Sequence, residues 1–138
     1  MASERSTVNL CVGFLTARDD IVEAVFRHQI QKHRADVYFL SLESGDDPTD
    51  EFMGRFKGNS LIKRVSQSTF GSSYFVMDIN SKERGAVLHA GPIKPINDNE
   101  VEVYAMISTG RDGSRGYSYH LLHEENQWVV KAEQPISE

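Results

Sequence analysis

The sequence predicts an α+β fold in which an N-terminal amphipathic helix packs on a curved, antiparallel meander sheet. Apolar residues recur at helical spacing between residues 16 and 34, whereas short alternating runs separated by turn residues follow from residue 61 onward. The composition agrees with this, because 39% hydrophobic and 25% charged residues are typical of a globular domain. We therefore expect one domain, residues 1–138, without an internal boundary.

The helix is the clearest local element. Thr16 is suited to cap its start, and Lys32 and Arg34 suit its end, where the helix dipole favours positive charge. At about 100° per residue, one side of this helix is apolar and must be covered by another element. The apolar side consists of Ile21, Val22, Val25, Phe26 and Ile30.

The segments on either side of this helix have less distinct patterns. Residues 8–15 precede it and are apolar enough to form a first strand. Residues 36–42 follow it with the sequence DVYFLSL, whose apolar residues at both alternating positions are typical of a strand buried on both faces. Residues 47–56 then predict a short helix that Asp47 caps, with Pro48 at its first position.

The second half of the chain predicts a series of strands. Their separators are mostly too short for a crossover helix, so consecutive strands should be antiparallel neighbours. Pro92 and Pro95 place part of one strand at an edge or a bulge, because proline cannot donate to a central ladder. The predicted strands span residues 61–69, 73–79, 86–96, 100–108, 116–124 and 127–133.

Gln29 is the main candidate for a functional residue, because it lies near the middle of the apolar side of the helix, with His33 one turn on. A buried amide without a partner costs about 1 to 3 kcal/mol, so either the sheet backbone holds Gln29 or it lines a pocket. In the pocket alternative no catalytic residue is assigned, and phenylalanines of the short helix form a lid. The ligand-binding residues would be Gln29, His33, Tyr38, Phe52, Phe56 and Tyr104.

Metal and cofactor chemistry have no support in the motifs. His120 and His123 are three apart on a predicted strand, so their side chains point to opposite faces and cannot share an ion. No nucleophile elbow, phosphate loop or HExxH occurs, and Cys11 lies among apolar residues, where a thiol is unreactive. We therefore expect no cofactor and no metal.

The charge and the cysteine content limit the partners and the compartment. A net charge of −5 argues against binding nucleic acid, and the basic residues 57, 63 and 64 read as a solvated face. The apolar run of residues 8–17 is too short to span a bilayer. A single cysteine gives no reason to expect an oxidising compartment, so we expect a cytoplasmic protein that binds neither nucleic acid nor membrane.

The order of the predicted elements resembles the cystatin-like architecture, including the nuclear transport factor two-like fold. Locally, VFRHQIQKH, DVYFLSL, DPTDEFMGRF, EVEVY and QWVVKAE are similar to segments of a group of small bacterial proteins of unassigned function. The wider fold includes isomerases, dehydratases, ligand binders and non-catalytic dimer modules, so the resemblance implies an architecture and no residue roles.

Two functions remain open at this point. The first is a non-catalytic binding or interaction module, a homodimer in which a second chain covers the other face of the sheet. Its basis is strand 100–108, where Val101, Val103, Ala105 and Ile107 share one face, and Tyr104 and Met106 lie on the other. The alternative is a small-molecule pocket between helix and sheet with Gln29 as a polar anchor, as in an isomerase, dehydratase or hydrolase.

Overall fold

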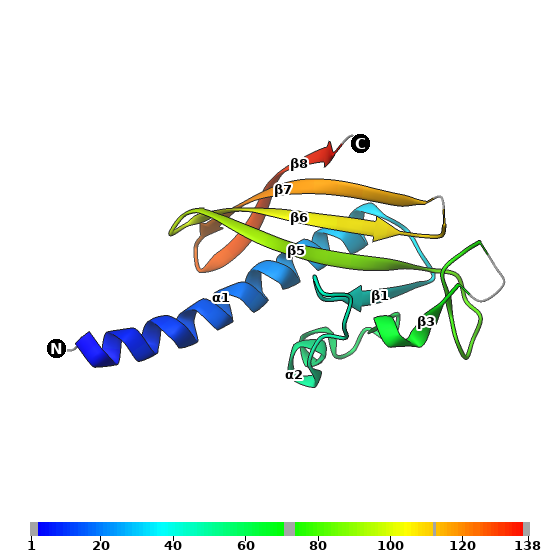
Figure 1. Cartoon of the computed structure of the whole chain (residues 1–138), viewed down its shortest axis with the longest axis horizontal. Coiled ribbons are helices and arrows are strands. Elements are labelled where there is room, and N and C mark those ends of the chain that lie inside the picture. Colours follow the sequence, from blue (N-terminus) through cyan, green and yellow to red (C-terminus); the bar gives the residue numbers. More distant parts are fainter. Residues whose placement is uncertain (1–2, 71–73, 112, 137–138) are drawn as a thin grey trace.

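The computed structural model describes residues 3–70, 74–111 and 113–136, and side chains from residue 17 onward. The C-terminal half of one long helix, α1 (Ser3–Lys32), lies along one face of a twisted sheet, and its N-terminal half projects beyond the sheet (Figure 1). The fold is therefore α+β, as predicted. The strands of the sheet are β1 (Val37–Ser41), β2 (Ile62–Arg64), β5 (Gly85–Asn97), β6 (Glu100–Ser108), β7 (Ser114–Glu124) and β8 (Gln127–Ile136).

The sheet is mixed rather than wholly antiparallel. Its strand order is β2-β1-β5-β6-β7-β8, and β5 to β8 form the predicted antiparallel meander. In contrast, β1 pairs in parallel with both β2 and β5. The chain between β1 and β2 contains a helical segment, and such a crossover returns the chain to the same direction, which is the condition for parallel pairing.

Helix α1 is longer than predicted. It begins at Ser3, so Thr16 does not cap it, and the strand predicted at residues 8–15 is wrong. Once a helix has formed, each added residue contributes a hydrogen bond without a new nucleation step, so the helix continues through this apolar run. The side chain of Cys11, which we expected to be buried, lies outside the described side chains. Within the described part of the chain, no helix is both long enough and apolar enough to cross a membrane.

The predicted apolar side of α1 is confirmed. Val25 and Phe26 are completely buried, and α1 packs against β5, β6 and β8. We call the sheet face in contact with α1 the inner face and the opposite one the outer face. Besides residues of α1, the main core contains the inner-face side chains Tyr38, Leu40, Ala86, Leu88, Ala90, Val101, Val103, Ala105, Ile107, Tyr117, Tyr119 and Leu121.

Strand β1 is buried on both faces, as predicted from its sequence. Its outer-face residues Val37 and Phe39 pack with Val76 and Val87 in a second, smaller core. The segment 61–79 that provides this cover is not the pair of strands predicted. It forms β2, then a 3-10 turn at Val65–Gln67, then β3 (Ser68–Thr69), which pairs with β4 (Met77–Asp78) in a separate two-stranded sheet.

The break after β2 has a local cause. The Gln67 side chain accepts a hydrogen bond from the Arg64 backbone N–H, and the Ser68 hydroxyl donates to the Val65 carbonyl. Such local bonds offer the backbone an alternative to a ladder, so the alternating pattern of residues 61–69 does not produce one strand.

The short helix α2 (Asp50–Met53) continues as a 3-10 turn at Gly54–Phe56. Its N-cap is Thr49, whose hydroxyl accepts from the Phe52 N–H at 3.1 Å, and neither Asp47 nor Pro48 has the predicted role. The Asp47 carboxylate instead accepts from the Ser66 N–H. The side chain of an N-cap accepts from the backbone N–H two or three residues further on. Thr49 lies three residues before Phe52 and can do this, whereas Asp47 lies too far from the start of the helix.

The predicted irregularity at the prolines is confirmed in β5. The pairing of β5 with β6 shifts between Ala90 and Ile93 and again between Pro95 and Asn97, and the Gly91–Pro92 peptide is cis. Strand β1 pairs with β5 only as far as His89, so the proline-containing part of β5 is an edge on that side. This irregular half of β5 ends in the hairpin that leads into β6.

Candidate functional site

Gln29 lies in the contact between α1 and the sheet, where it is completely buried, as predicted. Its amide Nε2 donates to the carbonyl oxygen of Met106 on β6 at 3.4 Å, which is a long hydrogen bond. Its carbonyl Oε1 has no hydrogen-bond partner among the described residues. The sheet backbone therefore satisfies only one end of this amide.

His33 follows one turn later, just after the last residue of α1. Its ring lies 5.7 Å from the ring of Tyr117, and its Nε2 is buried with no partner among the described residues. Burial lowers the pKa of His33, and this effect exceeds the opposite influence of the Glu133 carboxylate. The lowered pKa favours the neutral form of the imidazole.

Tyr119 completes this group from β7. It is completely buried, its ring stacks on Tyr117 at 5.8 Å, and its hydroxyl lies near Gln29 and Glu133 without a hydrogen bond of acceptable geometry to either. Burial, and after it the Glu133 charge, raises the pKa of Tyr119. We define the polar core cluster as Gln29, His33, Tyr119, His28 and Glu133, where His28 Nε2 lies 3.1 Å from a Glu133 oxygen.

The other predicted ligand-binding residues lie elsewhere. The hydroxyl of Tyr38 accepts from the Ala35 N–H at 3.1 Å and donates to the His33 carbonyl, so it closes the end of α1. Phe52 and Phe56 are core residues around Phe26 rather than a lid over a pocket, with the Phe26 and Phe52 rings 6.0 Å apart. Tyr104 belongs to the outer face, so the sheet separates it from Gln29.

An apolar pocket lies on the inner face, between α1 and the tips of the β5–β6 and β7–β8 hairpins. Figure 1 shows both tips at the end of the sheet where α1 leaves it. The pocket has a volume of about 430 Å³, within the range of ligand pockets. Its apolar lining includes Ile21, Val22, Ala90, Ile93, Val101 and Trp128.

Charged side chains line the same pocket. Arg18 comes from α1, Glu43 from the segment after β1, and Asp98 from the β5–β6 turn. All are exposed, and within the described residues none makes an ion pair or a side-chain hydrogen bond. Gly91 lets Glu43 approach, because a Cβ at this position would lie 3.2 Å from a Glu43 carboxylate oxygen.

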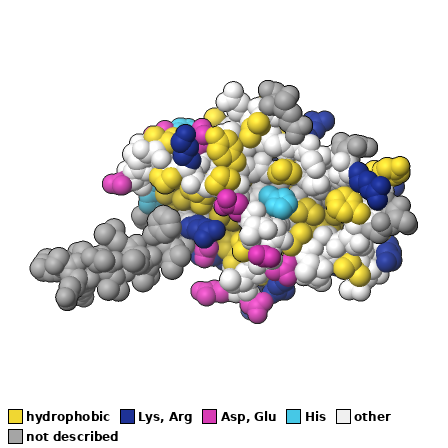
Figure 2. All heavy atoms as spheres, viewed as in Figure 1, with side chains coloured by type: hydrophobic (Ala, Val, Ile, Leu, Met, Phe, Trp, Pro, Cys, Tyr) yellow, Lys and Arg dark blue, Asp and Glu magenta, His cyan; other side chains and the backbone are white. Residues whose placement is uncertain are grey.

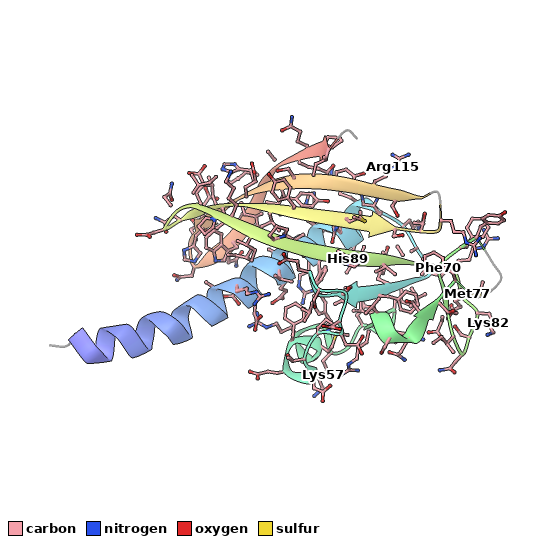
Figure 3. All side chains as sticks on the ribbon, viewed as in Figure 1. Lys57, Phe70, Met77, Lys82, His89 and Arg115 are labelled. Atoms are coloured by element: carbon pink, nitrogen blue, oxygen red, sulfur yellow. The ribbon has the colours of Figure 1, made fainter. Side chains whose placement is uncertain are left out.

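The outer face carries a second hollow, of about 480 Å³, over β5, β6 and β7. Tyr104 and Met106 stand on this face with 37% and 43% of their surface exposed, which confirms the predicted alternation along β6. Figure 3 places His89 on this face, and Figure 2, from the same side, shows hydrophobic side chains and an acidic one beside its position; Glu43 and Arg115 line the hollow together with His89. This part of the sheet therefore lacks the cover that α1 gives the inner face.

Asp78, a buried carboxylate outside these sites, belongs to a structural ion pair. Asp78 is completely buried, and its carboxylate binds Lys63 and the backbone N–H groups of Asn80 and Ser81. The Lys63 ammonium, and then these N–H groups, lower the pKa of Asp78 to about 2. Among the described residues, no group of three or more His, Cys, Asp or Glu side chains is placed to hold a metal.

The other basic and histidine residues of interest are also accounted for. Arg64 pairs with Asp50. His120 pairs with Glu100 on the outer face, and His123 lies 5.0 Å from Trp128 on the other, so these histidines point apart as predicted. Figure 3 places Lys57 beside the α2 segment, away from the sheet.

Sequence reasoning missed Trp128 and Glu133 as site residues. Both lie on β8, whose pairing with β7 shifts between His120 and Leu121. Simple alternation along β8 therefore does not predict which face of the sheet each side chain points to. The only signal was the position of Trp128 close to a turn, from which it reaches the middle of α1. Comparison of the chain with protein-family models, with curated proteins and with solved structures gives no match.

Proposed function

We propose that this protein is a non-catalytic interaction module that pairs with a second copy of itself through the outer face of its sheet. The observation that carries the proposal is the exposure of Tyr104 and Met106 on β6 and of Ile136 on β8, each at least 37%, on one face of the sheet. Aromatic residues and methionine are enriched in protein interfaces, whereas monomers seldom expose them together.

The charge distribution on the outer face favours a partner with the same surface. The central positions on β6, β7 and β8 carry no charged side chain: Tyr104, Met106, Gly116, Ser118, Gln134 and Ile136. At the rim, Glu102 lies opposite Lys94, and Glu100 pairs with His120. The uncharged centre can therefore meet its copy without like charges in contact, and Glu43 and Arg115, which line the hollow beside it, are of opposite sign.

The size of the face is sufficient for a dimer. Four strands spaced about 4.8 Å apart, each presenting about nine residues, form a surface of roughly 600 Å². Two copies would bury about 1,200 Å², which is the lower end of the range for specific interfaces. The hollow beside Tyr104 would receive a side chain of the partner.

Measurement of mass in solution tests this proposal. Sedimentation equilibrium from 1 to 100 µM should give a species of twice the 15.6 kDa chain mass. The substitution Met106→Glu should weaken the dimer at least about 100-fold, because it buries a carboxylate near its copy across a two-fold axis. Gln31→Glu, which adds the same charge on the exposed side of α1, should leave the mass unchanged. A monomer at 100 µM would refute the proposal.

The polar core cluster favours a second candidate, a small-molecule pocket of the nuclear transport factor two-like type, acting as an isomerase, dehydratase or hydrolase. Its support is the burial of three polar atoms that have no hydrogen-bond partner within the described part of the chain: Gln29 Oε1, His33 Nε2 and the Tyr119 hydroxyl. A neutral His33 can accept a proton, and the Tyr119 hydroxyl keeps its proton and can donate a hydrogen bond. The order of one helix, a strand–helix–strand unit and a meander is consistent with that architecture.

A thermal-shift screen tests the second candidate. A small polar ligand bound by the cluster should raise the melting temperature of the wild-type chain and of the Tyr104→Phe variant, but not that of Tyr119→Phe. Equal shifts for all three would exclude the cluster as the binding site.

Under either candidate, the single cysteine and the resemblance of local segments to bacterial proteins support a cytoplasmic, bacterial protein as part of the same proposal.

A further inference from the structure

We infer that the apolar pocket between α1 and the tips of the two hairpins binds a small amphiphilic amine. Such a molecule has an apolar or aromatic body and one ammonium group. This inference does not rest on the proposed dimer, because the apolar lining of the pocket lies on the inner face of the sheet and the dimer uses the outer face, although Glu43 and Gly91 line the edge of both hollows. It also does not involve the polar core cluster, which lies further along α1.

The shape and lining of the pocket determine the body of the ligand. Side chains from α1, β5, β6 and β8 enclose about 430 Å³ between the helix and the two hairpin tips. The interior side chains, such as Ile21, Ile93 and Val101, offer no hydrogen-bonding group, so a ligand gains by removing apolar surface from water. The volume admits a body of one or two rings, or a short alkyl chain.

The charges at the pocket determine the head group. Glu43 and Asp98 supply two carboxylates against the single guanidinium of Arg18, and none of these groups is paired within the described residues. An anionic head would meet this excess of negative charge on a chain that already carries −5. An ammonium group placed at the mouth would instead give Glu43 the partner it lacks.

Trp128 supplies aromatic surface for the body of the ligand. Its indole ring is part of the pocket lining, is only partly buried and packs on one side against His123. An aromatic body gains there from offset or edge-to-face contact with the indole. The same residue is the only tryptophan in the chain, so its fluorescence reports on this pocket without substitution of any residue.

The first experiment compares three probes with the same apolar body. 4-Phenylbutylamine, 4-phenylbutan-1-ol and 4-phenylbutyrate are titrated into the wild-type chain at pH 7 and constant ionic strength, and the Trp128 emission is recorded. The amine should give a saturable change and bind at least tenfold more tightly than the carboxylate, with the alcohol between them. Equal or tighter binding of the carboxylate, or no saturable change up to 10 mM amine, would overturn the inference.

The second experiment locates the head group and the body. Glu43→Gln should reduce the preference for the amine over the alcohol at least threefold, and Glu51→Gln, an exposed carboxylate on α2, should not change it. Ala17→Phe should fill the rim of the pocket and weaken all probes at least tenfold, whereas Gln31→Phe on the exposed side of the same helix should not.

Ala17 is partly exposed and Glu43 is exposed, so the Ala17→Phe and Glu43→Gln variants should fold. Far-ultraviolet circular dichroism checks that they do. The indole N–H signal of Trp128 in a ¹⁵N-resolved NMR spectrum provides a second readout. It should move on addition of the amine to the wild-type chain but not to Ala17→Phe. Unchanged binding to Ala17→Phe by both readouts would place the amine outside the pocket and refute the inference.

Discussion

Replacement of Gln29 by methionine should stabilise the protein. The two side chains have similar length and volume, so Gln29→Met removes the polar atoms without leaving a cavity. Gln29 is completely buried, and of its two polar atoms only Nε2 has a partner among the residues that the structure describes, the Met106 carbonyl at 3.4 Å. The substitution therefore removes one long hydrogen bond and one buried acceptor that has no partner.

The magnitude follows from these two contributions. A normal hydrogen bond contributes about 0.5 to 1.5 kcal/mol, and one of 3.4 Å lies at the low end, whereas a buried polar atom without a partner costs about 1 to 3 kcal/mol. The free energy of unfolding should therefore rise by about 1 kcal/mol in Gln29→Met. For a domain of this size, that corresponds to an increase in melting temperature of about 3 to 5 °C.

Urea unfolding followed by circular dichroism, together with a thermal melt, measures this effect. Protein concentration is held constant, because self-association would make the melting temperature depend on it. Gln31→Met is the matched control, because Gln31 lies on the exposed side of the same helix and its replacement should change the free energy of unfolding by less than about 0.5 kcal/mol. Destabilisation of Gln29→Met by more than about 1 kcal/mol would refute the reasoning, since it would mean that Oε1 has a partner such as the Tyr119 hydroxyl or a buried water.

Three further predictions concern the core and the turns. Asp78→Asn should lower the free energy of unfolding at pH 7 and reduce its dependence on pH between 3.8 and about 2. The lowered pKa of Asp78 contributes stability that is fully present above its ordinary value of 3.8 and is lost as the pH falls to about 2. Urea midpoints measured against pH test this. Gly91→Ala should lower the free energy of unfolding by about 1 to 3 kcal/mol, because Gly91 has a φ of +121°. Gly54→Ala should raise it by about 0.4 to 1 kcal/mol, because Gly54 has a φ of −60° and free space around its Cβ. Equal effects of the two substitutions in urea unfolding would contradict this. Phe26→Ala should lower the free energy of unfolding by about 3 to 5 kcal/mol, because the ring is completely buried, and a loss below about 2 kcal/mol would show that the contact between α1 and the sheet is looser than described.

Sequence reasoning located the elements whose pattern reflects their own burial. The apolar side of α1, the completely buried strand β1 and the alternation of β6 each follow from side-chain periodicity, because a helix or strand must turn its apolar residues away from water wherever it packs. The burial of Gln29 follows from the same argument, since its position on the helix fixes the direction of its side chain.

Which strands pair, and what surrounds a buried group, was decided only by the tertiary structure. The parallel pairing of β1 with β2 and β5 depends on contacts between segments far apart in the chain, and backbone hydrogen bonds form equally well for many partners. The apolar pocket exists because the irregular half of β5, the middle of α1 and Trp128 meet there. The predicted ligand-binding residues lie apart because they belong to elements that pack in different places, which local sequence does not specify. Local sequence determines which way a side chain faces, but only the packing of distant elements determines what it meets.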